Sequence, residues 1–230
     1  VPISTPSAQA ILAATKSLPV VFATVTDPVA AKIVPRMDKP GGNVTGVVDF
    51  PPLADHLALI KEISPNAKRV GVIYNPGEAN SIVQIKLLGP LMKKAGLTMV
   101  EGTATKSADV LAAARSLVGK VDVIYVPNDN TAVAAIETVL KVGMDNKVPV
   151  YAGDGTSVRK GAIATYGFNY RDIGRQAGRI VLRVIKGEKP GDISVEQAKD
   201  LSLYVNPGSA AKMGVTIPAA VVARAKTVVK

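Results

Sequence analysis

The sequence has 230 residues, of which 47% are hydrophobic and 20% charged, with a formal net charge of +10. This length can bury the core of one large domain or two modest ones, and the composition is that of a folded chain rather than a disordered one. The absence of cysteine excludes a disulfide scaffold, a thiolate zinc site and a cysteine nucleophile. The lysines and arginines are scattered singly or in pairs and are not interleaved with aromatic residues, so we expect a solvated basic surface and no nucleic-acid partner.

Strand-like apolar runs alternate with helix-like stretches along the whole chain. We expect strands at 1–3, 19–25, 44–48, 69–74, 98–102, 121–126, 149–152, 162–167 and 201–205. We expect helices at 7–17, 29–37, 53–63, 81–95, 107–117, 131–146 and 170–186, with a helical tail from Ser209. Such alternation predicts an α/β fold of parallel sheets with right-handed crossovers. A boundary between lobes would then be made by crossing segments near 47–52, 168–171 and 187–193.

Polar residues follow five of the predicted strands. In open parallel sheets, ligands bind at the carboxyl ends of the strands, where helix N-termini present free N–H groups. Ser, Thr, Asp and Asn are also preferred helix caps, so each cluster alone is best explained as a cap. Five clusters at equivalent positions instead predict a shared ligand site. The candidate ligand-binding residues are Ser4, Thr5, Thr26, Asp27, Tyr74, Asn75, Asn128, Asp129 and Asp154.

These candidates complement one another in charge. The hydroxyls of Ser4 and Thr5, with the N–H groups that begin the following helix, suit a carboxylate. Asp27, Asp129 and Asp154 suit an ammonium group. The two sets together predict a zwitterionic small molecule as the ligand.

Catalysis has little support in the sequence. The single histidine, His56, stands beside Asp55 in a helical pattern, and we expect it on the surface and outside any Ser-His-Asp triad. No His or Cys cluster predicts a metal site, and the acidic pattern at 128–130 is not that of a calcium loop. Neither Gly-x-Gly-x-x-Gly nor a Walker loop occurs, so we expect no nucleotide cofactor and no enzymatic activity.

Several segments carry a resemblance to a known family. They are Thr5-Pro6-Ser7-Ala8-Gln9-Ala10, Thr26-Asp27-Pro28-Val29, 40–46, 74–81, 126–131 and 169–176. Together, over essentially the whole chain, they resemble the substrate-binding proteins of bacterial ABC importers, in the branch that holds uncharacterised and aromatic-amino-acid-binding members. The resemblance implies the type I periplasmic binding protein fold, with two doubly wound parallel-sheet lobes that close over a ligand in the cleft between them by hinge motion.

The resemblance also implies a division of the chain. The first lobe would comprise 1–48 and 170–187, and the second 49–169 and 188–230. Family members carry further βα units before the position of Val1, so we expect a first lobe that is incomplete at its N-terminus. Ser4, Thr5 and Thr26 would hold the α-carboxylate of an amino acid, and Asp129 or Asp154 its amino group, while Tyr74 and Asn75 would close over it.

The expected function is therefore the solute-binding component of an ABC importer, with an aromatic or apolar amino acid as ligand and a membrane permease as partner. We expect it in the periplasm or lipid-anchored outside the cytoplasm, with the signal peptide removed or outside this chain. The alternative is a ligand-sensing module of a receptor or regulator with the same fold. An enzyme acting at the same cleft is the third possibility, which the missing nucleophile–base pair disfavours.

Overall fold

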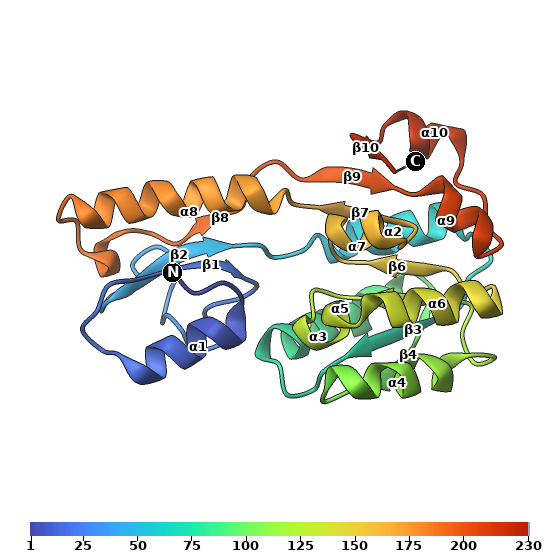
Figure 1. Cartoon of the computed structure of the whole chain (residues 1–230), viewed down its shortest axis with the longest axis horizontal. Coiled ribbons are helices and arrows are strands. Elements are labelled where there is room, and N and C mark those ends of the chain that lie inside the picture. The colour runs from blue at the N-terminus through green and yellow to red at the C-terminus, as the bar shows by residue number, and fades with distance from the viewer. Residues whose placement is uncertain (230) are drawn as a thin grey trace. The chain divides into compact units, whose positions relative to one another are not determined.

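The computed structural model describes residues 1–229 (Figure 1) and confirms the predicted α/β class. In chain order the elements, with η for short 3₁₀ helices, are α1 (Thr5–Ala14), β1 (Val20–Val25), β2 (Val44–Val48), α2 (Leu53–Ile63), β3 (Arg69–Tyr74), α3 (Ala79–Lys94), β4 (Thr98–Thr103), η1 (Ser107–Asp109), α4 (Val110–Leu117), β5 (Val123–Val126), α5 (Asn130–Ala134), α6 (Ile136–Asn146), β6 (Val150–Ala152), α7 (Gly155–Lys160), β7 (Ala164–Gly167), α8 (Tyr170–Ile185), η2 (Pro190–Asp192), β8 (Glu196–Gln197), β9 (Ser202–Val205), α9 (Pro207–Lys212), α10 (Ala219–Ala223) and β10 (Thr227–Val228).

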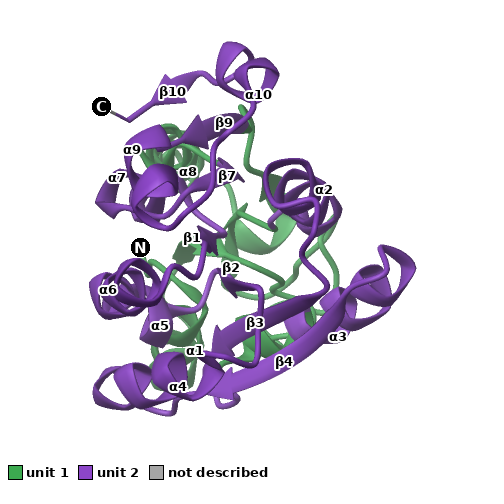
Figure 2. Cartoon of the chain, turned by 90° about the vertical axis from the view of Figure 1, so that its right-hand side faces the viewer, with its two compact units in different colours: residues 1–50, 78–83, 168–201 green, residues 51–77, 84–167, 202–230 purple. Residues whose placement is uncertain are grey.

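The chain divides into two compact units, which Figure 2 colours green and purple. Unit 1 comprises Val1–Phe50, Glu78–Val83 and Phe168–Leu201, and unit 2 comprises Pro51–Gly77, Gln84–Gly167 and Ser202–Lys230. These boundaries differ from the expected lobes chiefly at 78–83 and 188–201, which both group with unit 1. For 188–201 the reason is pairing, because β8 lies parallel to β2 at the edge of the unit 1 sheet.

Unit 1 is built on a three-stranded parallel sheet in the order β1-β2-β8. Phe22 and Val25 of β1 belong to one apolar cluster with Ala8 of α1, and Val21 and Ala23 belong to another with residues of α8. Alternate side chains of one strand thus enter two cores, and helices cover both faces of the sheet (Figure 1). This is the packing that buried parallel strands require.

Unit 2 contains two sheets. The first has four parallel strands in the order β4-β3-β5-β6. The second has the order β10-β9-β7, and here β7 and β9 run antiparallel. Fully parallel sheets were expected, so this prediction is wrong for β7 and β9. Their connection passes through unit 1 instead of forming a βαβ crossover, and the handedness rule for crossovers therefore does not apply.

Two predicted helices differ from the structure. Residues 29–37 form turns, because the N–H groups of Ile33 and Val34 both donate to the carbonyl of Pro28 and Lys32 has a left-handed φ of 57°. The helix predicted at 131–146 is two helices, α5 and α6, separated at Ala135 with φ −110° and ψ 21°.

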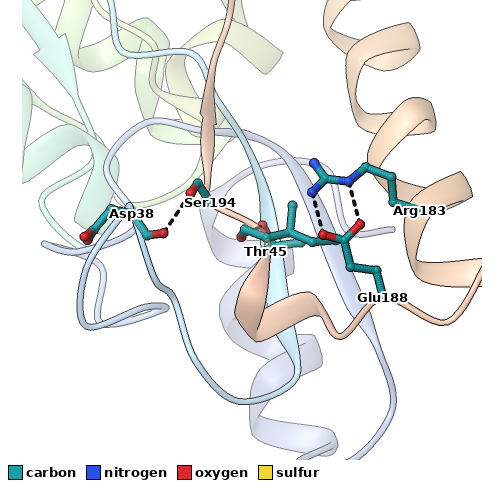
Figure 3. A network of polar contacts seen from close by, with 6 residues as sticks. Asp38, Thr45, Arg183, Glu188 and Ser194 are labelled. Atoms are coloured by element: carbon teal, nitrogen blue, oxygen red, sulfur yellow. Dashed lines mark hydrogen bonds and ion pairs between the residues drawn. The ribbon is translucent and has the colours of Figure 1, made fainter.

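The segment that follows α8 is anchored to the rest of unit 1 by a polar network (Figure 3). Arg183 of α8 makes a two-pronged ion pair with Glu188, at 2.6 and 2.7 Å. The hydroxyl of Thr45 in β2 donates to the carbonyl of Ile193 at 2.8 Å, and that of Ser194 donates to the carbonyl of Asp38 at 2.7 Å. The C-terminal end of α8 is therefore held in place on the sheet.

Candidate functional site

The backbone of unit 1 is strained where the chain enters α1. Ser4 has φ 82° and ψ 158°, and Thr24 near the end of β1 has φ 54°. The two are joined, since the N–H of Ser4 donates to the carbonyl of Ala23 at 3.1 Å and lies 3.2 Å from the Thr24 hydroxyl. Left-handed conformations of this kind cost about 1–3 kcal/mol per non-glycine residue and concentrate at functional sites.

Thr5, the first residue of α1, adds a second anomaly at the same place. It is 1% exposed, and its hydroxyl has no hydrogen-bond partner among residues 1–229. A buried hydroxyl left without a partner costs about 1–3 kcal/mol. No side chain caps α1, so the N–H groups and the positive end of the helix dipole also point out of the first turn. Hydroxyl and helix start together suit an anionic group.

The ends of β1 and β2 contribute two more buried polar residues to unit 1. Thr26 is 4% exposed and Asp49 is 3% exposed, and the N–H of Asp49 donates to the carbonyl of Val25 at 3.3 Å. Asp27 instead caps the following turn, because its Oδ1 accepts from the N–H groups of Val29 and Ala30. Asp49 was not among the predicted residues. The same signal was present for it, a carboxylate directly after a buried strand, in a segment interpreted only as a crossing.

The start of α3 also belongs to unit 1 and was not predicted as part of a site. Glu78, Asn80 and Ser81 are 7%, 2% and 0% exposed. The amide nitrogen of Asn80 donates to Glu78 Oε2 at 3.1 Å and to the Ser81 hydroxyl at 3.3 Å. Unit 1 therefore holds several buried polar side chains outside its apolar clusters. The sequence motif at 74–81 contained all three, and Glu78 belonged to the polar cluster after the strand predicted at 69–74, but none of the three was among the candidate ligand-binding residues.

In unit 2, the ends of the neighbouring strands β3 and β5 are joined by Asp129, which is 1% exposed. Its Oδ2 accepts from the N–H of Asn75 at 2.6 Å and its Oδ1 from the N–H of Ala132 at 2.6 Å, which caps α5. The side chain of Asn75 donates to the Thr131 hydroxyl at 2.9 Å and accepts from the N–H of Gly77 at 2.8 Å. Two of the predicted residues thus come together in one network.

Asn128 precedes this network and is fixed by Gln84 of α3. The N–H of Asn128 donates to Gln84 Oε1 at 3.2 Å, and Gln84 Nε2 donates to the carbonyl of Asn128 at 3.1 Å. Gly153 lies so close that a Cβ there would come within 2.5 Å of Asn128 Oδ1. The ends of β5 and β6 therefore approach each other as closely as a missing side chain allows.

Asp154 follows β6 and is 4% exposed. Its Oδ1 accepts from the N–H of Ser157 at 2.8 Å and its Oδ2 accepts from the Ser157 hydroxyl at 2.5 Å. Both carboxylate oxygens are used in capping α7, in agreement with the simplest interpretation of such a residue.

Tyr74, at the end of β3, is the predicted residue whose functional group points elsewhere. Its hydroxyl donates to Glu101 of the neighbouring strand β4. Burial and this carboxylate raise the pKa of Tyr74 to about 12. The phenol therefore stays neutral at physiological pH and is committed to Glu101 rather than to Asn75 and Asp129.

His56 was expected on the surface, and this prediction is wrong. It is 2% exposed, because it lies on the apolar side of α2. Nε2 is 2.7 Å from the carbonyl oxygen of Tyr166, and Nδ1 is 2.8 Å from the hydroxyl of Tyr125. A carbonyl only accepts, so Nε2 carries the hydrogen and Nδ1 accepts from Tyr125. Burial lowers the pKa of His56 to about 4, so the ring is neutral and structural in this position.

Within residues 1–229, no group of three or more His, Cys, Asp or Glu side chains is placed to hold a metal ion. In the same part of the chain, no helix combines the length and hydropathy needed to cross a membrane.

Comparison with known proteins identifies the family. The family model described as "ABC transporter substrate binding protein" matches residues 1–229. The chain belongs to this family. The predicted resemblance is thereby confirmed.

Individual members of the ABC substrate-binding family extend this finding. The chain is 43% identical over 204 residues to the "Tyrosine-binding protein" of Clostridioides difficile, which covers 89% of this chain and 59% of that protein. A conserved domain protein from Vibrio cholerae has a crystal structure with TM-score 0.96 and 46% identity, over 98% of this chain and 76% of that one. The ABC domain from Streptococcus pneumoniae in complex with L-Trp has TM-score 0.95 and 36% identity, over 99% and 77%. These structures support the type I periplasmic binding protein fold.

Proposed function

We propose that this chain is the extracytoplasmic solute-binding component of an ABC importer and that its ligand is an aromatic amino acid. Unit 1 supplies the contacts to the α-carboxylate, through Ser4, Thr5 and Thr26. A membrane permease receives the loaded protein. The relatives support the ligand class, since one carries tyrosine in its name and another was crystallised with L-Trp.

The observation that carries this proposal is the buried hydroxyl of Thr5. It is 1% exposed and has no partner in residues 1–229, and it lies at the uncapped start of α1 beside the strained Ser4. A carboxylate would accept from this hydroxyl and from the N–H groups of the first turn, and so would remove both costs. Strain that nothing in the free protein offsets is what a preorganised binding site displays.

The partner of the ligand's ammonium group is a carboxylate. Asp129 and Asp154 were predicted for this role, and both accept helix-capping hydrogen bonds. Asp49 is a further candidate, because it is buried beside Thr26 at the same end of the unit 1 sheet as Thr5.

Calorimetry and thermal unfolding with a panel of amino acids test the proposal. We expect L-Tyr, L-Trp and L-Phe to raise the melting temperature, because a ligand that binds only the native state stabilises it by mass action. L-Lys and L-Glu are the matched controls and should give a far smaller shift. If none of the aromatic amino acids shifts the transition at millimolar concentration, the proposed ligand class is wrong.

Thr5→Val tests the carboxylate contact itself. Valine has the shape of threonine without the hydroxyl, so the affinity for the aromatic ligand should fall roughly 10- to 100-fold, as for a lost hydrogen bond to a charged group. Thr45→Val is the control, since Thr45 is a buried threonine of the same unit whose hydroxyl is already bonded to Ile193. It should lower stability and leave affinity unchanged; equal affinity losses in the two variants would contradict the assignment.

A further inference from the structure

Helix α8 has a solvent face that is unusually basic and also carries large apolar side chains. Ile173, Gln176, Ala177 and Ile180 are its buried residues and pack toward the sheet of unit 1. At 100° per residue, Arg171, Arg175, Arg179, Leu182 and Lys186 lie within roughly 80° of arc on the opposite side. All five of these side chains are exposed. The outermost line of the helix is therefore cationic, with a leucine among the charges.

The positive charge of this face is only partly compensated. Arg175 pairs with Asp172 at 2.9 Å and Arg183 with Glu188 at 2.6 Å. Arg171 and Arg179 form no ion pair with any residue that the structure describes. Two guanidinium groups one helical turn either side of Arg175 thus remain available to phosphate oxygens, which Arg binds in a two-pronged geometry.

The large apolar side chains of this face are exposed to solvent as well. Leu182 is 56% exposed and Ile185 is 74% exposed. Each stands next to a cationic residue, Arg183 and Lys186 respectively. At the surface of a bilayer, such aliphatic side chains would contact the acyl chains while the neighbouring cationic groups stay among the lipid phosphates.

We propose that this α8 face (Arg171, Arg175, Arg179, Leu182, Ile185 and Lys186) docks unit 1 on the surface of an anionic phospholipid bilayer. Phosphate groups would accept from Arg171 and Arg179, while Leu182 and Ile185 would enter the boundary between headgroups and acyl chains. The end of α8 is already fixed by the network of Arg183, Glu188 and Thr45 (Figure 3), so the face needs no rearrangement before it docks. The proposal holds whichever solute the protein carries.

Charge decides among the possible occupants. A second copy of the chain would set arginines against arginines, which is repulsive. An acidic protein surface would satisfy the guanidinium groups, but the exposed Leu182 within this arc and the exposed Ile185 beside it favour a medium that accepts aliphatic groups together with phosphates. A membrane surface provides both, and a family of transporter components works beside one.

Vesicle flotation tests the proposal with the full chain. We expect binding to vesicles of equimolar phosphatidylglycerol and phosphatidylcholine, little binding to phosphatidylcholine alone, and release at about 0.5 M NaCl, where the Debye length is only a few ångström. Arg171→Gln with Arg179→Gln should weaken binding roughly 30-fold. The matched control is Lys93→Gln with Lys94→Gln, two exposed charges at the end of α3, which should weaken it at most about 3-fold. Failure to bind, or equal losses in the two double variants, overturns the proposal.

A fluorescence experiment tests whether the helix itself enters the interface. The chain has no tryptophan, so Leu182→Trp introduces a single reporter that keeps an apolar side chain at this position. Its emission should shift to the blue when anionic vesicles are added, whereas the reporter of Lys94→Trp should not shift. Vesicle binding without a blue shift at position 182 would show that another surface makes the contact and would overturn the assignment to α8. If an acidic protein covers this face instead, no vesicle-induced shift occurs.

Discussion

Asp129 and Asn75 at the strand ends of unit 2 use their hydrogen bonds within the fold, whereas the hydroxyl of Thr5 in unit 1 does not. In unit 2, Asp129 accepts from two backbone N–H groups, and Asn75 both donates and accepts. In unit 1, the buried hydroxyl of Thr5 has no partner within residues 1–229, and Ser4 is strained. Polar residues that follow parallel strands therefore complete the fold in unit 2, whereas in unit 1 they leave one buried hydroxyl without a partner among residues 1–229.

The largest effect that would sharpen this contrast is expected for Asp129→Ala. The substitution removes the cap of α5 and the acceptor for the N–H of Asn75, and we expect the free energy of unfolding to fall by about 4 kcal/mol. Urea unfolding measures this. Asp129→Asn keeps one acceptor and should lose roughly half as much. A loss below about 1 kcal/mol for alanine would mean that the unit 2 network is not structural, and the contrast would fail.

A second, slightly smaller effect concerns the pH dependence of stability through His56 of unit 2. Its pKa is lowered from 6.5 to about 4 by burial, so between these values the unfolded chain binds a proton that the native chain excludes. Stability should therefore fall as pH decreases from 6.5 to about 4, by roughly 3 kcal/mol in total.

His56→Gln provides the control for this pH effect. The glutamine does not titrate, so the variant should be less stable at pH 7 but should lose the histidine part of the slope. Urea unfolding across the pH range measures both quantities. An unchanged slope in the variant would show that His56 is not the group responsible.

For unit 1 the same comparison predicts a substitution that raises the free energy of unfolding instead of lowering it. Ser4→Gly should raise the free energy of unfolding by about 1 kcal/mol, because relief of the left-handed backbone exceeds the entropy cost of glycine. Ser17→Gly, at an exposed serine outside this strained junction, is the control and should give no gain. Destabilisation by Ser4→Gly would show that the backbone at this junction is not strained in the free protein. It would also remove one reason for assigning the ligand to the junction.

The smallest expected change in stability comes from substitutions in unit 1 that lie away from the strained junction at Ser4. A Cβ at Gly174 or Gly178 of α8 would meet nothing within 4 Å, so Gly174→Ala and Gly178→Ala should each add a little under 1 kcal/mol by helix propensity alone. Thermal unfolding measures the gain, and calorimetry should find ligand affinity unchanged. A change in ligand affinity would mean that the part of unit 1 that affects ligand binding is not confined to the start of α1.

Sequence periodicity predicted most helices and strands because apolar spacing reflects burial directly. It failed where other forces decide. Glu196 and Gln197 form a strand with no apolar signal, since pairing with β2 alone defines it. The turns at 29–37 depend on two hydrogen bonds to the carbonyl of Pro28, and the apolar spacing of this segment does not predict these bonds.

The strand-end rule located the polar clusters of both units but could not separate caps from binding residues. Thr5 and Asp129 satisfy the rule equally well. They differ in their hydrogen bonds, because Asp129 accepts from the N–H of Ala132 and the hydroxyl of Thr5 has no partner among residues 1–229. His56 was missed for a different reason. Its spacing from Leu53 and Ile60 places it on the apolar side of α2. Titratable side chains usually lie in water, and the sequence does not reveal the two hydrogen bonds that let this ring be buried.

The tautomer of His56 gives its hydrogen-bond chain a direction. The hydroxyl of Tyr125 points to Nδ1, and the N–H at Nε2 points to the carbonyl of Tyr166. A peptide oxygen has no hydrogen to return, so the chain cannot reverse its polarity. Any proton that reaches Nδ1 must first turn the Tyr125 hydroxyl away. In protein enriched in nitrogen-15, the ring nitrogen shifts of this single imidazole would therefore report whether α2, β5 and β7 are still assembled.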